Sequence, residues 1–243
     1  MIINFIITLY FYEFLFFSTL FHFVFAVLIL PFPFLKKYLH LSLSVSTKNI
    51  LLFISGSTLK YVSSKNPSFN TKKPVLIVCN HQSLFDILVI FSIFANKLRF
   101  SWVIKKSLFN IPFFGTVIST AGYIKLDRKN KYKAYKAIKK AIHTIKKNIS
   151  VAIFPEGTRS LSDTIQEFKS GSMVIATNTG VPILPVILKN TLYINQKGSF
   201  LINPQPIKIK ILEPIMISSK MKKDQNSMLL NIRKKMLKEY NSM

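Results

Sequence analysis

The chain has 243 residues and a formal net charge of +25, with 34 lysines and arginines against nine aspartates and glutamates. This length suits one main domain, and the charge calls for an acidic partner such as an anionic membrane or a phosphate-bearing small molecule. A hydrophobic content of 49%, with 22 phenylalanines, is unlike a solvated basic domain and argues against nucleic acid. The single cysteine, Cys79, excludes an intrachain disulfide and a cysteine-rich zinc site, and we expect no metal.

An apolar segment without any charged residue occupies residues 14–35. Its apolar run, residues 14–30, stops before Pro31 and Pro33 and is close to the ~17–25 residues that a membrane-spanning helix needs. A cleaved signal peptide is the competing interpretation. It is disfavoured because no lysine or arginine precedes the run and no small-residue cleavage pattern follows it.

Two features extend this segment into a membrane-attachment module. Lys36 and Lys37 follow the apolar run directly and favour a cytoplasmic location for the rest of the chain. A second apolar stretch, residues 50–59, is interrupted by a glycine and is too short to span, so we expect it at the membrane interface. Residues 1–60 are therefore predicted to form an apolar helical module, spanning or monotopic. It would hold a catalytic domain of residues 61–243 at the cytoplasmic face of the cell membrane.

After the membrane module, strand and helix signals alternate, which is typical of an α/β domain with a largely parallel sheet flanked by helices. Short apolar runs predict strands at residues 74–79, 100–104, 123–126, 151–154, 183–188 and 207–211. The last of these alternates with period two, as expected for a half-exposed edge strand. The chain has only seven glycines and no glycine-rich nucleotide loop, which argues against a dinucleotide-binding or P-loop fold.

Apolar residues at helical spacing predict helices between and after these strands. Residues 133–147 form a basic amphipathic helix, whose lysines we interpret as a solvated face, with lipid binding as the alternative. Residues 173–177 belong to a helix that ends at Gly180, and residues 228–240 to a closing amphipathic helix.

His81 and Asp86 stand five positions apart in the sequence NHQSLFD, directly after the strand predicted at residues 74–79. Five residues of helix turn the chain through about 140°, so the two side chains meet only if His81 lies in the turn and Asp86 in the next helix. The carboxylate would then hold one imidazole N–H and leave the other nitrogen free to accept a proton from a hydroxyl group. The alternative is a structural histidine beside an ordinary first-turn acid, because short motifs often match by chance.

A second polar cluster, FPEGTRS at residues 154–160, also follows a predicted strand and is expected at the same edge of the sheet. Arg159 offers a rigid fork of donors for a phosphate, and Glu156 can accept hydrogen bonds from a polyol hydroxyl. The alternative is a turn that carries a surface arginine.

Two further clusters contain fewer residues that could bind or react with a substrate. At the end of a predicted strand, residues 122–128 close with Asp127 and Arg128, and Arg128 is either a second phosphate ligand or the ion-pair partner of Asp127. The sequence VPILPV at residues 181–186 holds no titratable group, and we interpret it as scaffold.

In this order, the four clusters resemble the motifs of the glycerolipid acyltransferases, most closely the bacterial 1-acyl-sn-glycerol-3-phosphate acyltransferases, over about residues 73–190. One such cluster alone is a weak signal, whereas four in register are specific. The resemblance implies that family's fold and its membrane-embedding helical module, with His81 and Asp86 as the catalytic HX4D motif. The residues that it implies for substrate binding are Glu156, Gly157, Arg159, Lys105 and Arg128. Residues 168–171, FKSG, resemble a family element at the mouth of the active site.

The resemblance also implies a reaction, the transfer of an acyl chain to the sn-2 hydroxyl of 1-acyl-sn-glycerol 3-phosphate (lysophosphatidic acid), which gives phosphatidic acid. The donor would be acyl carrier protein or coenzyme A carrying a thioester, so no cofactor beyond this co-substrate is expected. His81, oriented by Asp86, would deprotonate the hydroxyl, and transfer would be direct, with Ser83 the nearest candidate for a covalent carrier. The partners would be the two substrates and membrane lipids.

Two alternatives to this function stay open. One is a related acyltransferase that uses another acceptor, such as glycerol 3-phosphate, and the other is a non-enzymatic basic protein associated with membranes. A lipid hydrolase would normally carry a Gly-x-Ser-x-Gly elbow, and the sequence has none.

Overall fold

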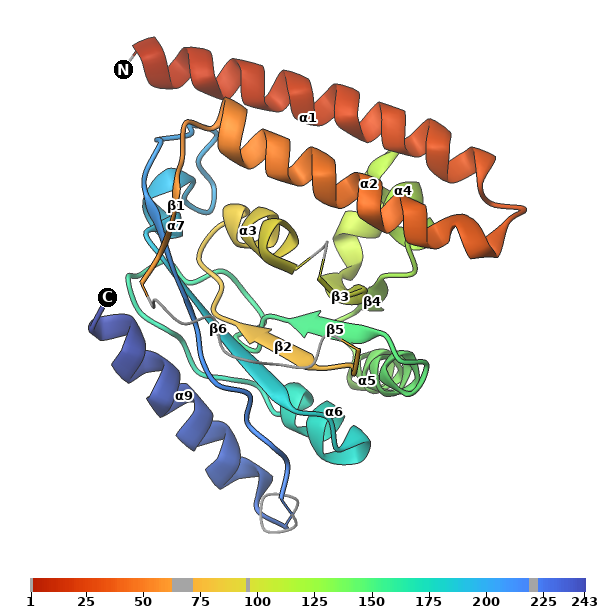
Figure 1. The fold of residues 1–243 in the computed structure, drawn as a ribbon, viewed down its shortest axis with the longest axis vertical. Coiled ribbons are helices and arrows are strands. Elements are labelled where there is room, and N and C mark those ends of the chain that lie inside the picture. The colour runs from red at the N-terminus through yellow and green to blue at the C-terminus, as the bar shows by residue number, and fades with distance from the viewer. Residues whose placement is uncertain (1, 63–71, 95–96, 219–222) are drawn as a thin grey trace.

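The structure, a computed structural model, describes residues 2–62, 72–94, 97–218 and 223–243. The described residues form a seven-stranded sheet with the order β1-β7-β6-β2-β5-β3-β4 (Figure 1). Only the contact between β6 and β7 is antiparallel, so the predicted largely parallel sheet is confirmed. The strands are β1 (Leu59–Tyr61), β2 (Leu76–Cys79), β3 (Phe100–Lys105), β4 (Ile124–Leu126), β5 (Ser150–Ile153), β6 (Ile183–Lys189) and β7 (Ile207–Ile211).

The predicted strands are confirmed to within two residues at each end, but the expected sheet edge is wrong. Strand β7 shows the predicted alternation of buried and half-buried residues, yet it is covered on its outer side by β1, in which Leu59 pairs with Ile207. Strand β1 was not predicted, because three residues are too few to show a periodic pattern. In addition, its first residue, Leu59, was assigned to the apolar stretch that we expected at the membrane interface.

Helices cover both faces of the sheet (Figure 1). One face carries α3 (Phe85–Phe94), with α1 (Ile2–Leu28) and α2 (Lys36–Asn49) above it. The opposite face carries α5 (Lys131–Lys146), α6 (Gly171–Thr179) and α9 (Gln225–Asn241). Shorter helices complete the chain: η1 (Pro33–Leu35), η2 (Ile50–Ile54), η3 (Lys106–Asn110), α4 (Phe114–Thr120) and α7 (Thr191–Ile194).

Strand β2 shows why the central strands read as continuous apolar runs. Leu76 and Val78 pack into the core cluster under α5, α6 and α9, whereas Ile77 and Cys79 pack into the cluster under α3. Successive side chains of a strand point to opposite faces, and here both faces are covered, so no position is left for a polar residue. Burial raises the pKa of the Cys79 thiol well above its usual value, so Cys79 acts as a small packed residue of the core.

The predicted basic amphipathic helix is confirmed as α5. The Asn130 side chain caps its first turn by accepting the Lys133 N–H at 2.9 Å. Ala137, Ala141 and Ile145 are buried against the sheet, and the lysines of the helix are exposed, as a surface helix with a solvated face requires.

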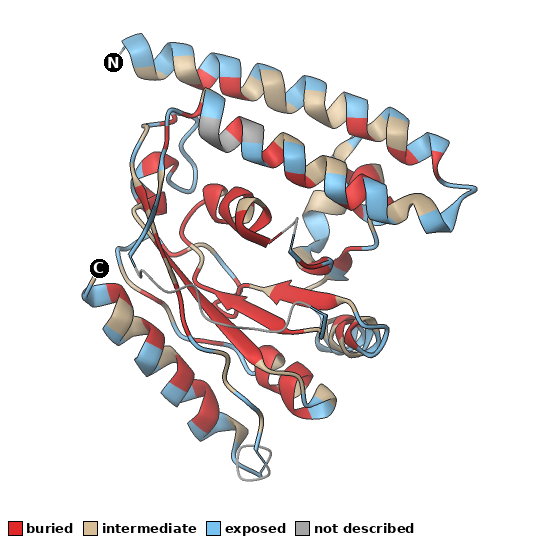
Figure 2. Cartoon of the chain, in the orientation of Figure 1, coloured by how far each residue is buried: buried red, intermediate tan, exposed pale blue. Residues whose placement is uncertain are grey.

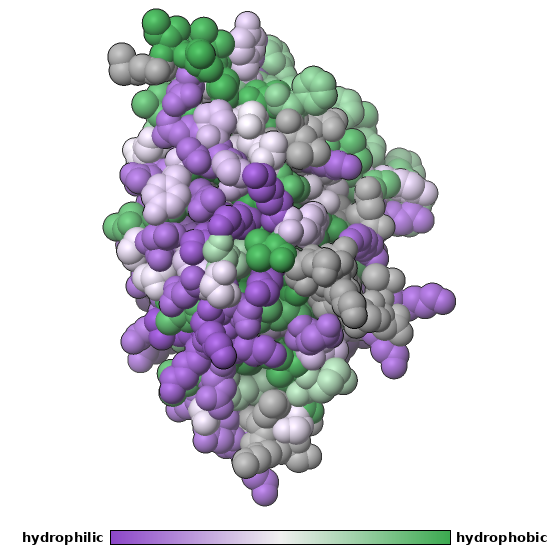
Figure 3. Space-filling model, turned by 60° about the vertical axis from the view of Figure 1, so that its left-hand side comes forward, coloured by the Kyte–Doolittle hydropathy of each residue, from purple (hydrophilic) through white to green (hydrophobic). Residues whose placement is uncertain are grey.

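The N-terminal helix α1 is long and apolar enough to cross a membrane, and only 17% of its most apolar window is buried. Large hydrophobic side chains on α1 and η2 face outward, with exposed fractions of 63% for Phe21 and 90% for Phe53. Exposed and half-buried residues follow one another along most of α1 (Figure 2). In the space-filling view, hydrophobic side chains gather at the end of the molecule formed by the N-terminal helices, and hydrophilic ones cover the body below (Figure 3). This outer surface indicates membrane association.

The same helix is also fixed to the rest of the protein. The Thr8 hydroxyl accepts the Ile202 N–H at 2.9 Å, and the Phe11 ring stacks on Phe85 of α3 with the ring centroids 5.4 Å apart. Strand β1 lies across the predicted domain boundary at residue 60 and belongs to the sheet. The N-terminal helix therefore packs directly against the rest of the protein, on α3 and on the segment before β7.

Candidate active site

His81 and Asp86 form the contact that the sequence predicted. The His81 Nδ1 atom lies 2.9 Å from the Asp86 Oδ2 atom, with His81 in the turn after β2 and Asp86 in the first turn of α3. The same oxygen accepts the backbone N–H groups of Gln82 at 2.6 Å and Ser83 at 2.8 Å. Three donors thus converge on one oxygen of a fully buried carboxylate. The partial positive charge at the N-terminus of α3 also stabilises the negative charge of Asp86.

This geometry defines the state of the imidazole ring. Because its neighbour is a carboxylate oxygen, Nδ1 is assigned as the N–H that donates to Asp86. The Nε2 atom is then an acceptor, and in the described part of the chain no hydrogen bond engages it. The ring is therefore held in the tautomer that a general base requires.

Two aromatic residues fix the plane of the His81 ring. Phe154, directly after β5, stacks on it with the ring centroids 3.9 Å apart and the planes 9° from parallel. Trp102 of β3 stacks on the other side of Phe154 at 5.2 Å. Phe154 belongs to the predicted second cluster, but its ring had no predicted role, and Trp102 was not predicted at the site. The stack depends on β2, β5 and β3 being consecutive neighbours in the sheet.

The second predicted cluster lies beside His81, because β2 and β5 are adjacent parallel strands. The His81 N–H donates to the Glu156 Oε1 atom at 2.7 Å, and the His81 carbonyl oxygen accepts the Ser160 N–H at 2.7 Å. On the other side, the Asn80 side chain donates to and accepts from the backbone of Leu188 in β6, at 2.8 and 2.9 Å. The turn that carries His81 is thus bonded to β6 on one side and to the segment after β5 on the other.

Glu156 has a partner that differs from the polyol hydroxyl we expected. Its side chain is only 3% exposed, and its second oxygen accepts the Gln166 N–H at 3.0 Å. Burial raises the pKa of Glu156 to about 7, although the hydrogen bonds from the His81 and Gln166 backbone act in the opposite direction. The carboxylate therefore holds the His81 turn, and its predicted contact with glycerol stays a prediction.

Gly157 needs to be a glycine in this turn. Its φ of +73° is strained for a residue with a side chain, and a Cβ atom would lie 3.1 Å from Cε of Lys169. The Lys169 N–H donates to the Pro155 carbonyl oxygen at 2.8 Å. The structure thus brings the predicted FKSG element, through Lys169, against the turn of the second cluster.

The three predicted cationic residues lie at the carboxyl edge of the sheet. Arg159 is half-buried in the turn after β5, Lys105 is exposed at the end of β3, and Arg128 is exposed just past β4. Lys105 is paired with Leu126 across parallel strands, so Lys105 and Arg128 share this edge with the His81 turn. Asp127 bonds to Lys106 at 3.2 Å, so its interpretation as the ion-pair partner of Arg128 is wrong. Among the described residues, Arg159, Lys105 and Arg128 form no ion pair.

Ser83 is not presented as a nucleophile. Its side chain is fully buried, and its hydroxyl donates to the carbonyl oxygen of Asn195 at 2.9 Å. The hydroxyl therefore holds the loop between α7 and β7.

Comparisons with known proteins agree with these features. The Acyltransferase family model matches residues 60–189, which is more than half of the chain and includes the His81 turn and the second cluster. The crystal structure of the 1-acyl-sn-glycerophosphate (LPA) acyltransferase PlsC from Thermotoga maritima is similar, with a TM-score of 0.77 and 27% identity. That similarity covers 100% of this chain and 98% of that chain.

Curated relatives carry related names. A 1-acyl-sn-glycerol-3-phosphate acyltransferase from Limnanthes douglasii is 33% identical over 190 residues, covering 78% of this chain and 66% of that protein. A protein of the same name from Salmonella typhimurium is 35% identical over 146 residues, covering 59% of this chain and 57% of that protein. The chain thus spans 57% to 66% of the length of these two relatives. By its motifs, its fold and these matches, the chain belongs to the acyltransferase family.

Proposed function

We propose that the protein transfers an acyl chain from acyl carrier protein or coenzyme A to the sn-2 hydroxyl of 1-acyl-sn-glycerol 3-phosphate, giving phosphatidic acid. The observation that carries the proposal is the His81 ring, bonded to Asp86 through Nδ1 and with Nε2 unused, at the sheet edge that also bears three cations. The names of the relatives and of the structural neighbour support this choice of acceptor.

The geometry supports a direct transfer. The Nε2 atom of His81 accepts the hydroxyl proton while Asp86 holds the Nδ1 side, and the substrate oxygen attacks the carbonyl carbon of the thioester. The new ester C–O bond forms, the C–S bond breaks, and the leaving thiolate takes the proton from Nε2. The committed hydroxyl of Ser83 and the buried thiol of Cys79 favour a route without a covalent acyl-enzyme. Holding the substrate hydroxyl close to His81 lowers the activation barrier by an energy on the order of several kcal/mol, because the reacting groups are already oriented.

The test is an assay of the purified protein in detergent micelles with labelled lysophosphatidic acid and each thioester donor. Phosphatidic acid is expected with at least one donor. Acylation of glycerol 3-phosphate but not of lysophosphatidic acid would favour the related acyltransferase. Lipid binding without any acyl transfer would favour the non-enzymatic protein.

Arg159 is proposed as the main phosphate ligand, with Lys105 and Arg128 beside it. We expect Arg159→Ala to raise the KM for lysophosphatidic acid at least about tenfold, because a charge-assisted contact with phosphate is lost, with a smaller effect on kcat. Steady-state kinetics at varied acceptor concentration measure this. Arg99→Ala is the matched control. Arg99 is an exposed arginine directly before β3, at the amino end of the strand, whereas the proposed phosphate ligands follow the carboxyl ends of the strands. A collapsed kcat with an unchanged KM would contradict the phosphate role.

We propose that the protein sits at the cell membrane as a monotopic protein, with its catalytic domain on the cytoplasmic face. Helix α1 contacts the catalytic domain near both ends, from Asn4, which bonds to Asn203, to Phe23, whose ring packs against Phe113. A helix docked in this way cannot cross a bilayer without taking the domain with it, whereas it can lie in one leaflet with its exposed side in the lipid. The two lysines after the apolar run support the cytoplasmic side.

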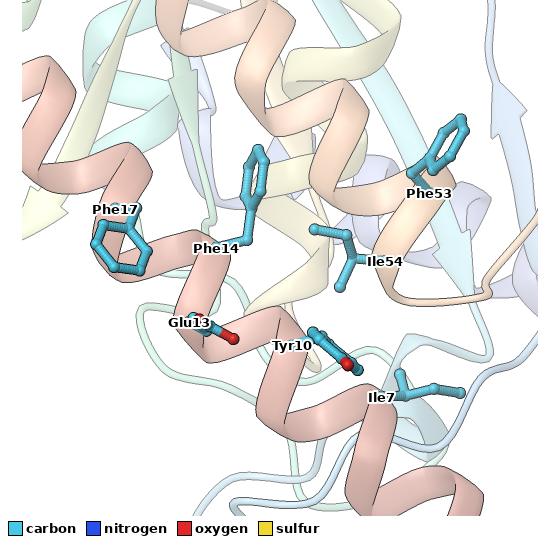
Figure 4. Close-up of a pocket in the computed structure, with 7 residues that line it drawn as sticks. All are labelled: Ile7, Tyr10, Glu13, Phe14, Phe17, Phe53 and Ile54. Atoms are coloured by element: carbon cyan, nitrogen blue, oxygen red, sulfur yellow. The ribbon is translucent and has the colours of Figure 1, made fainter.

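An open apolar groove on the N-terminal helices supports the same location. Its volume is about 600 Å³, and it lies between α1 and η2. Among the described residues that line it, Glu13 is the one with a charge (Figure 4). The lining residues are Ile7, Tyr10, Glu13, Phe14, Phe17, Phe53 and Ile54. None of them belongs to the predicted catalytic or substrate-binding set, so the groove forms part of the surface that lipid would cover.

Membrane fractions provide the test of this location. We expect the protein to remain with the membranes through high-salt and alkaline washes and to be released by detergent, because apolar contacts rather than charge hold it there. Release by salt alone would contradict an apolar anchor. Labelling of an engineered surface cysteine on α5 only after the membrane is permeabilised would support the cytoplasmic side, and labelling in intact cells would contradict it.

A further inference from the structure

The C-terminal helix α9 reaches the active-site loops through its last turns. The buried hydroxyl of Tyr240 donates to the Asp163 carboxylate and accepts the Gln82 Nε2–H at 2.9 Å. Lys189, the last residue of β6, donates from Nζ to the Tyr240 carbonyl oxygen at 3.1 Å and also lies over the Tyr240 ring. The tyrosine is therefore fixed at both its backbone and its ring, and its hydroxyl has a defined position.

From Tyr240, two hydrogen bonds lead to the carboxylate of the catalytic pair. Gln82 is fully buried and follows His81 directly in the chain. Its side chain bonds to Tyr240, and its backbone N–H donates to Oδ2 of Asp86 at 2.6 Å, the same oxygen that faces His81. If Gln82 shifts, its backbone N–H moves relative to Oδ2 of Asp86. This is the oxygen that holds the His81 ring in place.

A second contact from α9 leads to the histidine itself. Arg233 donates from Nε to the Gln166 carbonyl oxygen at 2.8 Å and from Nη2 to the Ile165 carbonyl oxygen at 2.9 Å. The Gln166 N–H donates to Glu156, which in turn accepts the His81 N–H. Both members of the catalytic pair are thus connected to one helix on the opposite face of the sheet from α1 (Figure 1).

Apolar packing alone does not require these contacts. The helix already covers the sheet with a stripe of buried side chains that include Met228, Leu229, Ile232 and Met236. Tyr240 and Arg233 instead direct their polar atoms at the loops after β2 and β5. Buried polar groups with several partners fix a single arrangement of the segments that they join.

We infer that α9 is a positioning element of the active site, and that Tyr240 is a positioning residue that acts on the His81–Asp86 pair through Gln82. This inference rests on the proposed function for its kinetic test. The hydroxyl of Tyr240 holds the Gln82 side chain, and Gln82 holds the turn in the geometry that brings three donors to Oδ2 of Asp86.

The test is Tyr240→Phe in the full chain, which removes one oxygen atom and keeps the ring. We expect kcat to fall by about 10- to 100-fold, as small displacements of catalytic groups do, while the KM for lysophosphatidic acid stays within about twofold. Hydrogen exchange is expected to be faster at the Gln82 and Ser83 amides, measured by mass spectrometry on the peptide that contains them. Tyr123→Phe is the matched control, because Tyr123 is equally buried and its hydroxyl bonds to His40, away from the site.

A double-mutant cycle separates the route through Gln82 from general loosening. If Tyr240 acts through Gln82, Gln82→Met and the double variant will have the kcat of Tyr240→Phe within about threefold, because both changes break the same contact between Tyr240 and Gln82. Unchanged kcat and exchange in folded Tyr240→Phe would overturn the inference, as would a loss of kcat equal to the unfolded fraction.

If Tyr240→Phe does not fold, Arg233→Lys tests the second contact. A lower kcat is expected, and an unchanged kcat would overturn the inference. Absence of activity in the wild type would instead refute the proposed function, and the exchange data would still test the role of Tyr240.

Discussion

His81→Ala is expected to lower kcat about 1000-fold or more, because a positioned general base contributes on the order of 10²–10⁴ to the rate. The KM for lysophosphatidic acid is expected to change little, because the proposed phosphate ligands are other residues, at the ends of β3, β4 and β5, and stay in place. The measurement is single-donor steady-state kinetics with labelled acceptor, together with thermal unfolding to confirm that the variant is folded.

The matched control for this variant is His143→Ala. His143 is exposed in the last turn of α5, on the opposite face of the sheet from α3, and should leave both constants unchanged. A His81→Ala enzyme that keeps kcat within about tenfold of the wild type would refute the base assignment.

Asp86→Asn is the second change with a large expected effect. The asparagine keeps the size of the side chain but is neutral, and its NH2 group cannot accept from an imidazole N–H. In the structure, three N–H groups converge on Oδ2, so a correctly oriented asparagine oxygen still satisfies them but no longer stabilises the imidazolium that forms during proton transfer. We expect kcat to fall by about 10²- to 10⁴-fold, with the KM for the acceptor nearly unchanged.

Kinetics and unfolding together separate this effect from damage to the fold. Asp224→Asn is the matched control, because Asp224 caps α9 by accepting the Ser227 N–H and asparagine caps helices equally well. Equal activity of Asp86→Asn and wild type would show that the carboxylate only supports the turn.

Local sequence patterns predicted the parts of the site that lie within one strand, turn and helix. The contact between His81 and Asp86 follows from a buried strand, a turn and a helix start in succession. The spacing by itself left a structural histidine as the alternative, and the four clusters in register favoured the catalytic interpretation. The same reasoning placed Arg159 at the end of β5, because polar residues after an apolar strand collect at one edge of a parallel sheet.

Contacts between distant segments were beyond the sequence patterns. The stack of His81, Phe154 and Trp102 requires the order of β2, β5 and β3, and the bond from Gln82 to Tyr240 joins residues 158 positions apart. The inward direction of the Glu156 carboxylate was missed because an acid in a turn is more often solvated. Strand β1 was missed because it gains its partners only from β7, almost 150 residues further along the chain.

The docking of α1 has a consequence for how the protein is assembled. Phe11 is almost fully enclosed, and its partner Phe85 stands one residue before Asp86, while Thr8 supplies the acceptor for the backbone of Ile202. Removing α1 would expose these groups to water at the base of the catalytic helix. We therefore expect α1 to unfold together with the catalytic domain, and a truncation that lacks α1 to be less stable than the full chain.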